Sequence, residues 1–343
     1  MSIVVLNLPS VKRKSEERPK QCPYCKGETF QRWGQVNKAV KDTRFRQVKV
    51  YRYRCCHCKR TFRHYPAGVS HAQQSERLMK LCVIMWSLGL SHRGVALILS
   101  VFGVRLSHMS GWRDVQEAGQ RIRRRLKWKA ARVVGVDGAW VAGKGILVAV
   151  DLGDGELLSI AEIDEKEKFA VETWLKALKQ QHNIGAIVTD DLATYKEIAR
   201  ELEVGHQICQ FHVRRWTGKA LKVLEQELPS EWLYVIPKLQ DLIHDLPSNG
   251  SKVLYELWKQ FPGRVTQPDE KRTPLEKLRD LVLRLSKDWE RYIEFYHDPG
   301  IPWTNNRTEQ IIGRLKNRAK RVRGYKTSDG LLAGSLVASQ FWT

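Results

Sequence analysis

The stretch RVVGVDGAWV, residues 132–141, decides the fold, because it is a β-rich run that carries one carboxylate, Asp137, between two glycines. Its mostly apolar composition is typical of a buried strand. Two more β-rich runs follow at residues 145–152 and 157–163, and the glycine-rich turn 153–155 joins them. These three runs predict an antiparallel meander.

The chain then alternates between helix and strand. Residues 168–181 have the apolar spacing of a helix, residues 184–189 a short strand, residues 192–202 a helix and residues 206–209 another short strand. This order predicts an α/β fold with a ribonuclease-H-like domain over residues 132–343.

Two features complete that predicted domain. Residues 228–298 are rich in Leu and Trp with helical spacing, and we interpret them as a helical insertion. A final helix is expected from about Asn305, which is a residue type that commonly caps a helix N-terminus.

The charge of the chain favours an anionic polymer as its partner. The 343 residues carry a formal net charge of +22, with 59 Lys and Arg against 37 Asp and Glu. The charge is clustered, since residues 1–65 hold 17 basic and 4 acidic residues. The alternative is a solvated basic surface, which would not require such clustering.

Composition also bears on location. Residues 1–20 are polar and charged without periodicity, which predicts a disordered basic tail. The sequence has no apolar run of membrane-spanning length and no secretory signal pattern. We therefore expect no membrane association, a cytoplasmic and nucleoid-associated protein in a prokaryotic host, and reduced cysteines.

Two CxxC pairs about thirty residues apart predict a structural zinc site in a zinc ribbon over residues 21–66. The alternating run of residues 46–54 is expected to form strands of that ribbon. Cys56 and His57 are spare donors, so the fourth ligand stays open, and unliganded cysteines are the alternative. The expected Zn²⁺ ligands are Cys22, Cys25, Cys55 and Cys58.

Residues 75–127 are predicted to form a helix-turn-helix domain. Expected helices over residues 75–88 and 92–102 are separated by a glycine turn, and a third begins after Ser107 or Ser110 and runs to about residue 118. An ordinary three-helix bundle without DNA contact is the alternative. The candidate base readers on the third helix are His108, Ser110, Arg113 and Gln116.

Three carboxylates form the candidate catalytic site. Asp137 lies in the first strand of the meander, Asp190 ends the fourth strand, and Glu309 lies one turn into the last helix. Such a cluster suits two Mg²⁺ (or Mn²⁺) ions about 3.5–4 Å apart in phosphodiester chemistry. In the last helix, Arg307 and Lys316 are candidate DNA contacts.

Nearby carboxylates compete for these roles. Asp151 precedes a turn and is the rival for the first position, and Asp191 follows Asp190 directly. We expect Asp191 to cap the following helix instead. An aspartate at a strand end is also commonly structural, so each one alone is weak evidence.

Four segments carry a resemblance to a known family: VVGVDGAWV (133–141), IVTDDLATYKEI (187–198), HQICQFHVRRW (206–216) and TNNRTEQIIGRLKNRAKRVRGYKT (304–327). Through them the chain resembles prokaryotic insertion-sequence transposases with a DDE catalytic triad, of the broad mutator-like grouping. One departure is Asp191, where that family often has a small residue such as Gly.

The resemblance implies a function in DNA transposition. Its N-terminal modules would bind transposon ends in double-stranded DNA. The catalytic domain would nick DNA to expose a 3′-hydroxyl and join it to target DNA, as a homodimer or larger assembly. Cys209 and His212 match a CxxH signature that such enzymes place after the second Asp, and they are auxiliary candidates near the scissile phosphate. A buried Cys and a hydrogen-bonded structural His are the alternative.

The sequence leaves two main alternatives to a transposase open. A transposase-derived regulator would need only the N-terminal half, and an intact triad argues against it. The sequence distinguishes a transposase poorly from a ribonuclease-H-like nuclease that cuts DNA without joining it, so a joining assay is needed. A defective transposase copy is a third possibility.

Overall fold

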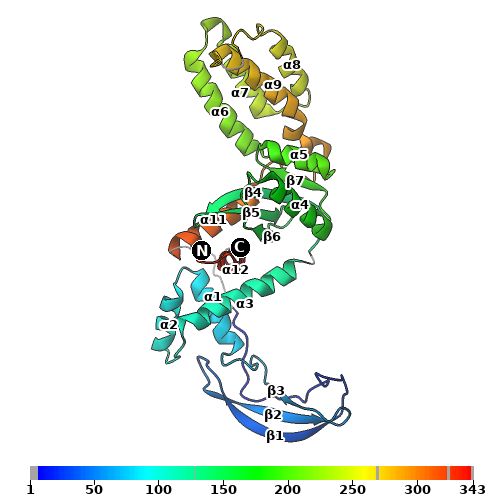
Figure 1. Cartoon of the computed structure of the whole chain (residues 1–343), viewed down its shortest axis with the longest axis vertical. Helices are drawn as coiled ribbons and strands as arrows, with labels where there is room; N and C mark the ends of the chain where they lie inside the picture. Colours follow the sequence, from blue (N-terminus) through cyan, green and yellow to red (C-terminus); the bar gives the residue numbers. More distant parts are fainter. Residues whose placement is uncertain (1–6, 128, 268–269, 323–324, 341–343) are drawn as a thin grey trace. The chain divides into compact units, whose positions relative to one another are not determined.

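The computed structural model describes residues 7–127, 129–267, 270–322 and 325–340 (Figure 1). The chain divides into two compact units. Unit 1 consists of Met1–Ile122 with Asn317–Thr343, and unit 2 of Arg123–Lys316. Among the described residues, no helix is both long enough and apolar enough to cross a membrane.

Unit 1 contains a three-stranded antiparallel sheet in the order β1-β2-β3. Val48 and Val50 of β2 are buried on one face of this sheet, in a small core with Val11, Val40 and Val69. The sheet includes the run that the sequence predicts as ribbon strands. Its strands are β1 (Phe30–Ala39), β2 (Gln47–Cys55) and β3 (Thr61–His64).

The segment before the sheet differs from the expected disordered tail. Val11 is 7% exposed within the valine core, and the backbone N–H of Lys49 donates to the Arg13 carbonyl at 2.7 Å. Lys12 N likewise donates to the Ala67 carbonyl at 3.0 Å. A single valine inside a charged run shows no periodicity, so this packing could not be predicted from the local sequence. Residues 1–6 lie outside the described residues.

The helices of unit 1 begin at the residues that the sequence suggests. The Ser75 side chain accepts from Leu78 N, and Ser91 accepts from Gly94 N at 3.0 Å. Ser107, rather than Ser110, accepts at the start of the third helix. That helix is longer than predicted. The helices are α1 (Glu76–Ser87), α2 (His92–Val101), α3 (His108–Leu126) and α12 (Ser328–Ser339).

A shared core joins the first three helices to the C-terminal helix. Leu78, Trp86 and Val115 are buried together with Val337 of α12. At Gly119 of α3, an added Cβ would lie only 2.7 Å from the backbone of α12. The glycine therefore allows the two helices to pack in direct backbone contact.

Unit 2 contains a five-stranded mixed sheet in the order β6-β5-β4-β7-β8. The first three strands in sequence form the predicted antiparallel meander. The last two strands run parallel to β4. The strands are β4 (Val133–Val141), β5 (Lys144–Asp151), β6 (Leu157–Ala161), β7 (Ala186–Thr189) and β8 (Gly205–Ile208).

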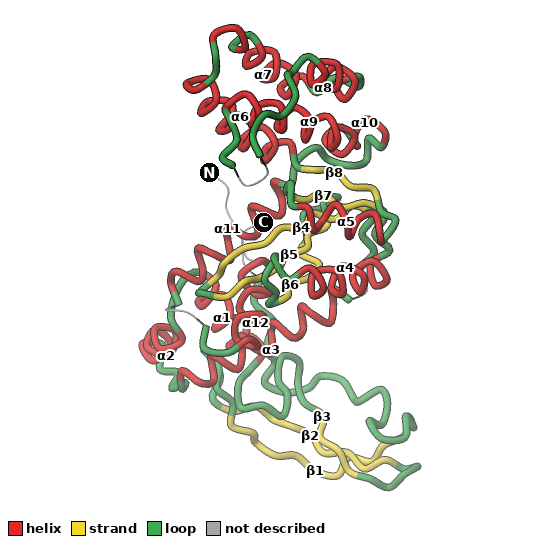
Figure 2. Tube along the Cα trace, turned by 45° about the horizontal axis from the view of Figure 1, so that its top comes forward, coloured by secondary structure: helices red, strands yellow, loops and turns green. Residues whose placement is uncertain are grey.

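Helices cover both faces of this sheet (Figure 2). On one face, Val134 and Val136 of β4 are buried with Leu175 of α4 (Lys168–His182) and Ile198 of α5 (Ala193–Glu201). Side chains alternate along a strand, so Gly135 and Asp137 belong to the opposite face. There α11 (Asn306–Arg321) approaches Gly135.

A separate helical layer follows the sheet, as the predicted insertion requires (Figure 1). Its core includes Leu221 and Leu224, so the second half of α6 belongs to this layer although the sequence analysis began it at residue 228. A capping box of Thr273 and Glu276 begins α9. Its elements are α6 (Gln210–Glu227), the 3-10 turn Ser230–Trp232, α7 (Val235–Asp245), α8 (Gly250–Lys259), α9 (Pro274–Tyr292) and α10 (Glu294–His297).

Asn305 does not cap α11 with its side chain, which corrects the sequence prediction. Its Nδ2 donates to the Val136 carbonyl of β4 at 3.0 Å instead. Its backbone carbonyl accepts from Glu309 N at 3.1 Å. The side chain therefore joins the helix to the sheet, a long-range contact that local sequence could not reveal.

Gly135→Ala should destabilise the protein. The new Cβ would lie 2.1 Å from Asn305 Oδ1 and 2.2 Å from Thr308 Oγ1, both of which are buried. We expect a loss of about 1–3 kcal/mol in the free energy of unfolding, measured by urea denaturation. The matched control is Gly313→Ala in α11, where no atom lies within 4 Å of an added Cβ.

The control should raise the free energy of unfolding by about 0.5–1 kcal/mol, because alanine replaces a helical glycine. Equal stability of the Gly135→Ala protein and the parent protein would contradict the close approach of α11 to β4.

Candidate active site and metal centres

The sheet places Asp137 and Asp190 at the same end of two neighbouring strands. Gly135 of β4 pairs with Val188 of β7 in a parallel ladder. Two residues further along each chain, Asp137 remains in β4 and Asp190 directly follows β7. Both side chains are half-buried. The register therefore makes these two carboxylates neighbours.

Burial and nearby negative charge raise the pKa of both carboxyls. Burial, followed by the charges of Glu165 and Asp190, raises the pKa of Asp137 to about 7, although the charge of His212 opposes this shift. Burial and Glu165 likewise raise the pKa of Asp190 to about 6. Such shifts mark a site where negative charge is concentrated and where a bound cation would favour the ionised forms.

Glu165 is a carboxylate of this site that the sequence analysis missed. The buried hydroxyl of Tyr195 donates to its Oε1 at 2.6 Å. An added Cβ on Gly138 would lie 2.5 Å from its Oε2, so the glycine after Asp137 makes room for it. A hollow of about 210 Å³ opens beside Glu165 and Asp190. No pattern distinguishes Glu165 from its acidic neighbours in residues 162–167.

Glu309 lies in a second group, with His212 and Cys209. The three ligand atoms lie within 4.8 Å of one another, and His212 Nε2 is 3.6 Å from Glu309 Oε1. The Cys209 side chain raises the pKa of His212 to about 9, and the charges of Asp137 and Glu309 act in the same direction. The imidazole is therefore a cation that faces carboxylates from both groups.

The structure thus brings the predicted residues together in two groups rather than one. Among the described residues, the close group around Glu309 contains neither Asp137 nor Asp190. His212 interacts electrostatically with members of both groups. That the three carboxylates form one shared site stays a prediction.

The start of α11 carries buried oxygen atoms with unused acceptor capacity. Within the described part of the chain, Asn305 Oδ1, Thr308 Oγ1 and Glu309 Oε1 are buried and have no hydrogen-bond partner. A buried oxygen without a hydrogen-bond partner costs free energy, so in native proteins it commonly marks a functional role or a bound water or ion. These atoms, like the carboxylate oxygens of the two aspartates, are hard oxygen donors of the kind that Mg²⁺ or Mn²⁺ prefers.

The competing carboxylates have structural partners. Asp191 forms ion pairs with Lys196 at 2.5 Å and Arg284 at 2.7 Å, and it does not cap α5 as expected. Asp151 accepts from Gly153 N at 2.8 Å and pairs with Lys129 at 3.0 Å. Because cations already neutralise both, neither is as available for a metal as Asp190.

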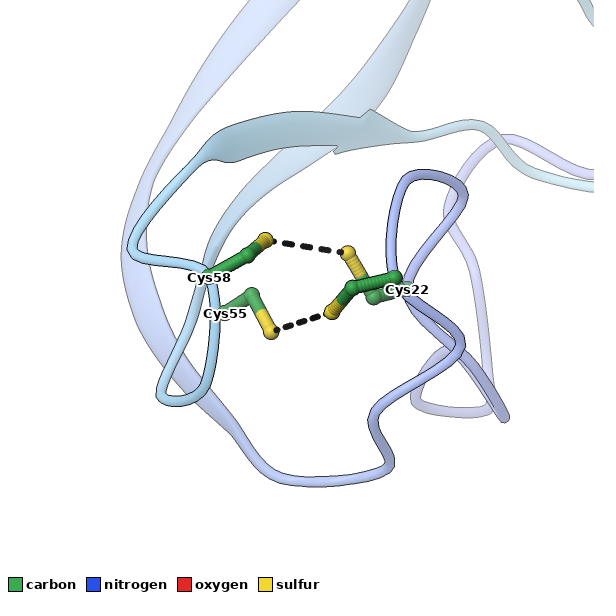
Figure 3. Close-up of side chains that lie close together, drawn as sticks. Cys22, Cys55 and Cys58 are labelled. Atoms are coloured by element: carbon green, nitrogen blue, oxygen red, sulfur yellow. Dashed lines mark hydrogen bonds between the residues drawn. The ribbon is translucent and has the colours of Figure 1, made fainter.

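Four cysteines in unit 1 form a compact thiol cluster (Figure 3). Cys22 Sγ lies 3.8 Å from Cys58 Sγ, and Cys25 Sγ lies 3.6 Å from Cys55 Sγ. A tetrahedral zinc with Zn–S bonds of about 2.3 Å separates its sulfurs by about 3.8 Å. The four thiols therefore fit a Zn²⁺ ion, and Cys56 is not part of this cluster.

Backbone N–H groups lower the pKa of one of these thiols, that of Cys55. The N–H groups of Cys58 and His57 lower the pKa of Cys55 to about 6, although burial opposes this shift. His57 N donates to the Cys55 sulfur at 3.4 Å. Thiolates are the zinc-binding form of cysteine. Cys82, by contrast, is buried among apolar side chains, and burial raises its pKa.

The candidate DNA contacts occupy different environments. On α3, His108 and Arg113 are exposed, whereas Ser110 and Gln116 are half-buried. The Ser110 hydroxyl is also paired with that of Ser107 at 3.0 Å. On α11, Arg307 and Lys316 are both exposed. The four exposed side chains are accessible to a partner, and contact of any of these residues with DNA stays a prediction.

Two comparisons with known proteins place the chain in a family context. Residues 165–331 match the family described as "Transposase IS66 family". Over 338 residues, the chain is 23% identical to "Insertion element ISM1 uncharacterized 48.3 kDa protein" of Methanobrevibacter smithii, covering 94% of this chain and 82% of that protein. The family match includes Asp190 and Glu309 and begins after Asp137. Neither match specifies the mutator-like grouping.

Cys22→Ser and Cys56→Ser should differ in zinc content. We expect the purified parent protein and Cys56→Ser to hold one Zn²⁺ per chain by elemental analysis. Cys22→Ser should lose most of it and melt at a lower temperature, because metal binding stabilises such small domains. Loss of zinc from Cys56→Ser would show that Cys56 is a ligand and would contradict the four-thiol cluster.

Proposed function

We propose that the chain is an insertion-sequence transposase that cleaves transposon ends and joins them to target DNA, a role that its similarity to the IS66 transposase family and to an insertion-element protein supports. In this proposal unit 2 carries a ribonuclease-H-like catalytic domain of the DDE type. The mixed sheet, with an antiparallel meander followed by two strands parallel to β4, supports that assignment.

One observation carries the proposal. The parallel register of β4 and β7 makes Asp137 and Asp190 neighbours, and His212 links them electrostatically to Glu309. These side chains come from two strands and two helices that are distant in the sequence. Burial raises the pKa of both aspartates, and Asp190 lines the hollow beside Glu165, which a purely structural role would not require.

Asp137, Asp190 and Glu309 are the residues that would hold the catalytic Mg²⁺ or Mn²⁺. The raised pKa values of the two aspartates fit this role, and so does Glu309 Oε1, which is buried and accepts no hydrogen bond, because a cation would stabilise all three oxygens. When bound, the metal would activate the attacking oxygen and stabilise the leaving oxygen of the phosphodiester.

The side chains around the carboxylates supply the remaining functions. His212, protonated at neutral pH, can donate a hydrogen bond to a phosphate oxygen and so position the scissile bond. The hydroxyl of Tyr195 holds Glu165 beside the aspartates. Cys209 anchors the segment, since its sulfur accepts from Asn305 N at 3.3 Å.

Unit 1 is the proposed DNA-binding part, with the thiol cluster as a structural zinc site. Its helix α3 carries exposed His108 and Arg113, two of the candidate base readers. Arg307 and Lys316 are proposed contacts to DNA phosphates in unit 2. Joining two transposon ends would require two copies of the chain, so we propose a homodimer or larger assembly on DNA.

Asp137→Asn, Asp190→Asn and Glu309→Gln should each abolish the chemistry while retaining DNA binding. We expect cleavage of labelled transposon-end DNA with Mg²⁺ or Mn²⁺ to fall by at least about 100-fold, because even outer-shell partners of a metal site are worth 10–100-fold. Affinity for the same DNA should stay within about 3-fold. Asp151→Asn is the matched control and should keep the cleavage activity.

A plasmid target in the same reaction separates the rival functions. Cleavage without joining would indicate a nuclease. DNA binding without cleavage by the parent protein, with either metal, would indicate a regulator or a defective copy. Full activity in any of the three carboxylate variants would remove that residue from the proposed triad.

Glu165→Gln should weaken metal binding without removing the site. Glu165 is the first electrostatic neighbour of both aspartates, so its loss reduces the negative charge that attracts the cation. We expect the Mn²⁺ concentration for half-maximal binding, measured by electron paramagnetic resonance of free Mn²⁺, to rise about 10-fold. Glu162→Gln, in the same acidic run, should leave it unchanged. Equal affinities in both variants would exclude Glu165 from the site.

A further inference from the structure

A pocket of about 750 Å³ lies within unit 1, at α2, α3 and the segment leading into α12. Its volume is in the range of sites that bind small molecules. Aromatic and basic side chains dominate its lining, and the described lining residues include no acid. The lining residues that bear on the argument are Trp86, His108, Trp112, Arg321, Tyr325 and Lys326.

Trp112 offers an aromatic surface with no partner of its own. Trp86 is buried, its ring is stacked with His92 at 5.9 Å between centroids, and Arg318 lies over it at 4.0 Å. Trp112, in contrast, is 37% exposed and stacks on no other ring in the described part of the chain. An exposed indole beside a cavity is a suitable platform for another planar ring.

Buried donors beside the pocket lack acceptors. Among the described residues, Trp86 Nε1 and two guanidinium nitrogens of Arg318 are buried without a hydrogen-bond partner. Trp86 is 2% exposed and Arg318 4%. Trp86 lines the pocket, whereas Arg318 lies over the Trp86 ring outside that lining, so a ligand that brings an acceptor atom to Trp86 Nε1 would be favoured.

The charge of the pocket selects for an anionic ligand. Arg321 and Lys326 are exposed at the pocket, with Arg93 nearby in its lining. A ligand that is planar, rich in acceptors and negatively charged satisfies all three features. A nucleotide has these properties, with a base to stack, ring and carbonyl acceptors, and a phosphate.

The pocket also divides the predicted base readers into two sets. His108 and Gln116 line it together with Trp112, whereas Ser110 and Arg113 do not. Residues four apart on a helix share a face, so one face of α3 belongs to the pocket and another remains for groove contact. The same helix therefore presents two distinct surfaces.

We propose that this pocket binds an unpaired nucleotide of DNA, with its base stacked on Trp112 and its phosphate beside Arg321 and Lys326. The proposal rests on the proposed DNA-binding function of unit 1. The unpaired nucleotide has two possible sources, a base extruded from a duplex or a single-stranded end. Both present the same chemistry to the pocket.

The test compares three DNAs of 20 base pairs and one sequence. The first is fully paired, the second carries one extra unpaired 2-aminopurine within the duplex, and the third carries 2-aminopurine in a short 3′ overhang. Affinity is measured by anisotropy of a terminal dye, and stacking by the decrease in 2-aminopurine fluorescence. We expect the parent protein to prefer one or both unpaired DNAs by about 10-fold, and the preferred arm identifies the source.

Three variants locate the effect. Trp112→Ala should bind all three DNAs within about 2-fold of one another and should no longer quench 2-aminopurine. Lys326→Ala, at an exposed position that tolerates substitution, should also reduce the preference. Phe102→Ala removes an aromatic ring that is 65% exposed and lies outside the pocket lining, so its preference should match the parent protein.

The outcomes separate this proposal from the function on which it rests. Equal binding of the three DNAs by the parent protein, without quenching, would overturn the pocket assignment and leave DNA binding intact. A preference that survives in Trp112→Ala and Lys326→Ala would also overturn it. Failure to bind any of the three DNAs would overturn the proposed DNA-binding function, and the pocket assignment with it.

Discussion

The contact between Gly135 of β4 and the first turn of α11 is the constraint on which the candidate active site depends. No side chain separates strand from helix there, and Asn305 Nδ2 donates to the Val136 carbonyl. Because α11 is fixed to β4 at this point, Glu309 lies about one helical turn from the contact. The carboxylate is also in the first turn, where the helix dipole favours negative charge. Glycine is thus required at position 135 for reasons of space rather than backbone conformation.

The half-buried Asp137 makes the stability of the fold depend on pH. The pKa of Asp137 rises from about 3.8 in an unfolded chain to about 7 in the fold, so the folded state binds more protons between these values. Its stability therefore falls as the pH rises through this window. His212 offsets part of the repulsion. Functional sites commonly lower the stability of a fold, because their charged groups are retained for the reaction and not for folding.

Local sequence patterns predicted most elements of unit 2 and the helices of unit 1, because those elements depend on periodicity and caps. The helices α1 and α2 lie within one residue of their predicted ranges, and the β4–β5–β6 meander follows its apolar runs. The errors concern long-range contacts. Val11, Asn305 and Glu165 each acquire their role from a partner distant in sequence, and neither propensity nor spacing contains that information.

The two surfaces of α3 illustrate this limit most directly. Its sequence shows an amphipathic helix with polar and aromatic residues, a pattern that is equally suited to a DNA groove and to a pocket wall. The pocket exists because α12 packs against α3 at Gly119 and the segment before α12 brings Tyr325 and Lys326 to the same place. Those residues come from the opposite end of the chain. His108 and Gln116 line the pocket, whereas Arg113 does not. Side chains that contact a DNA groove would therefore come from the face of α3 that carries Arg113.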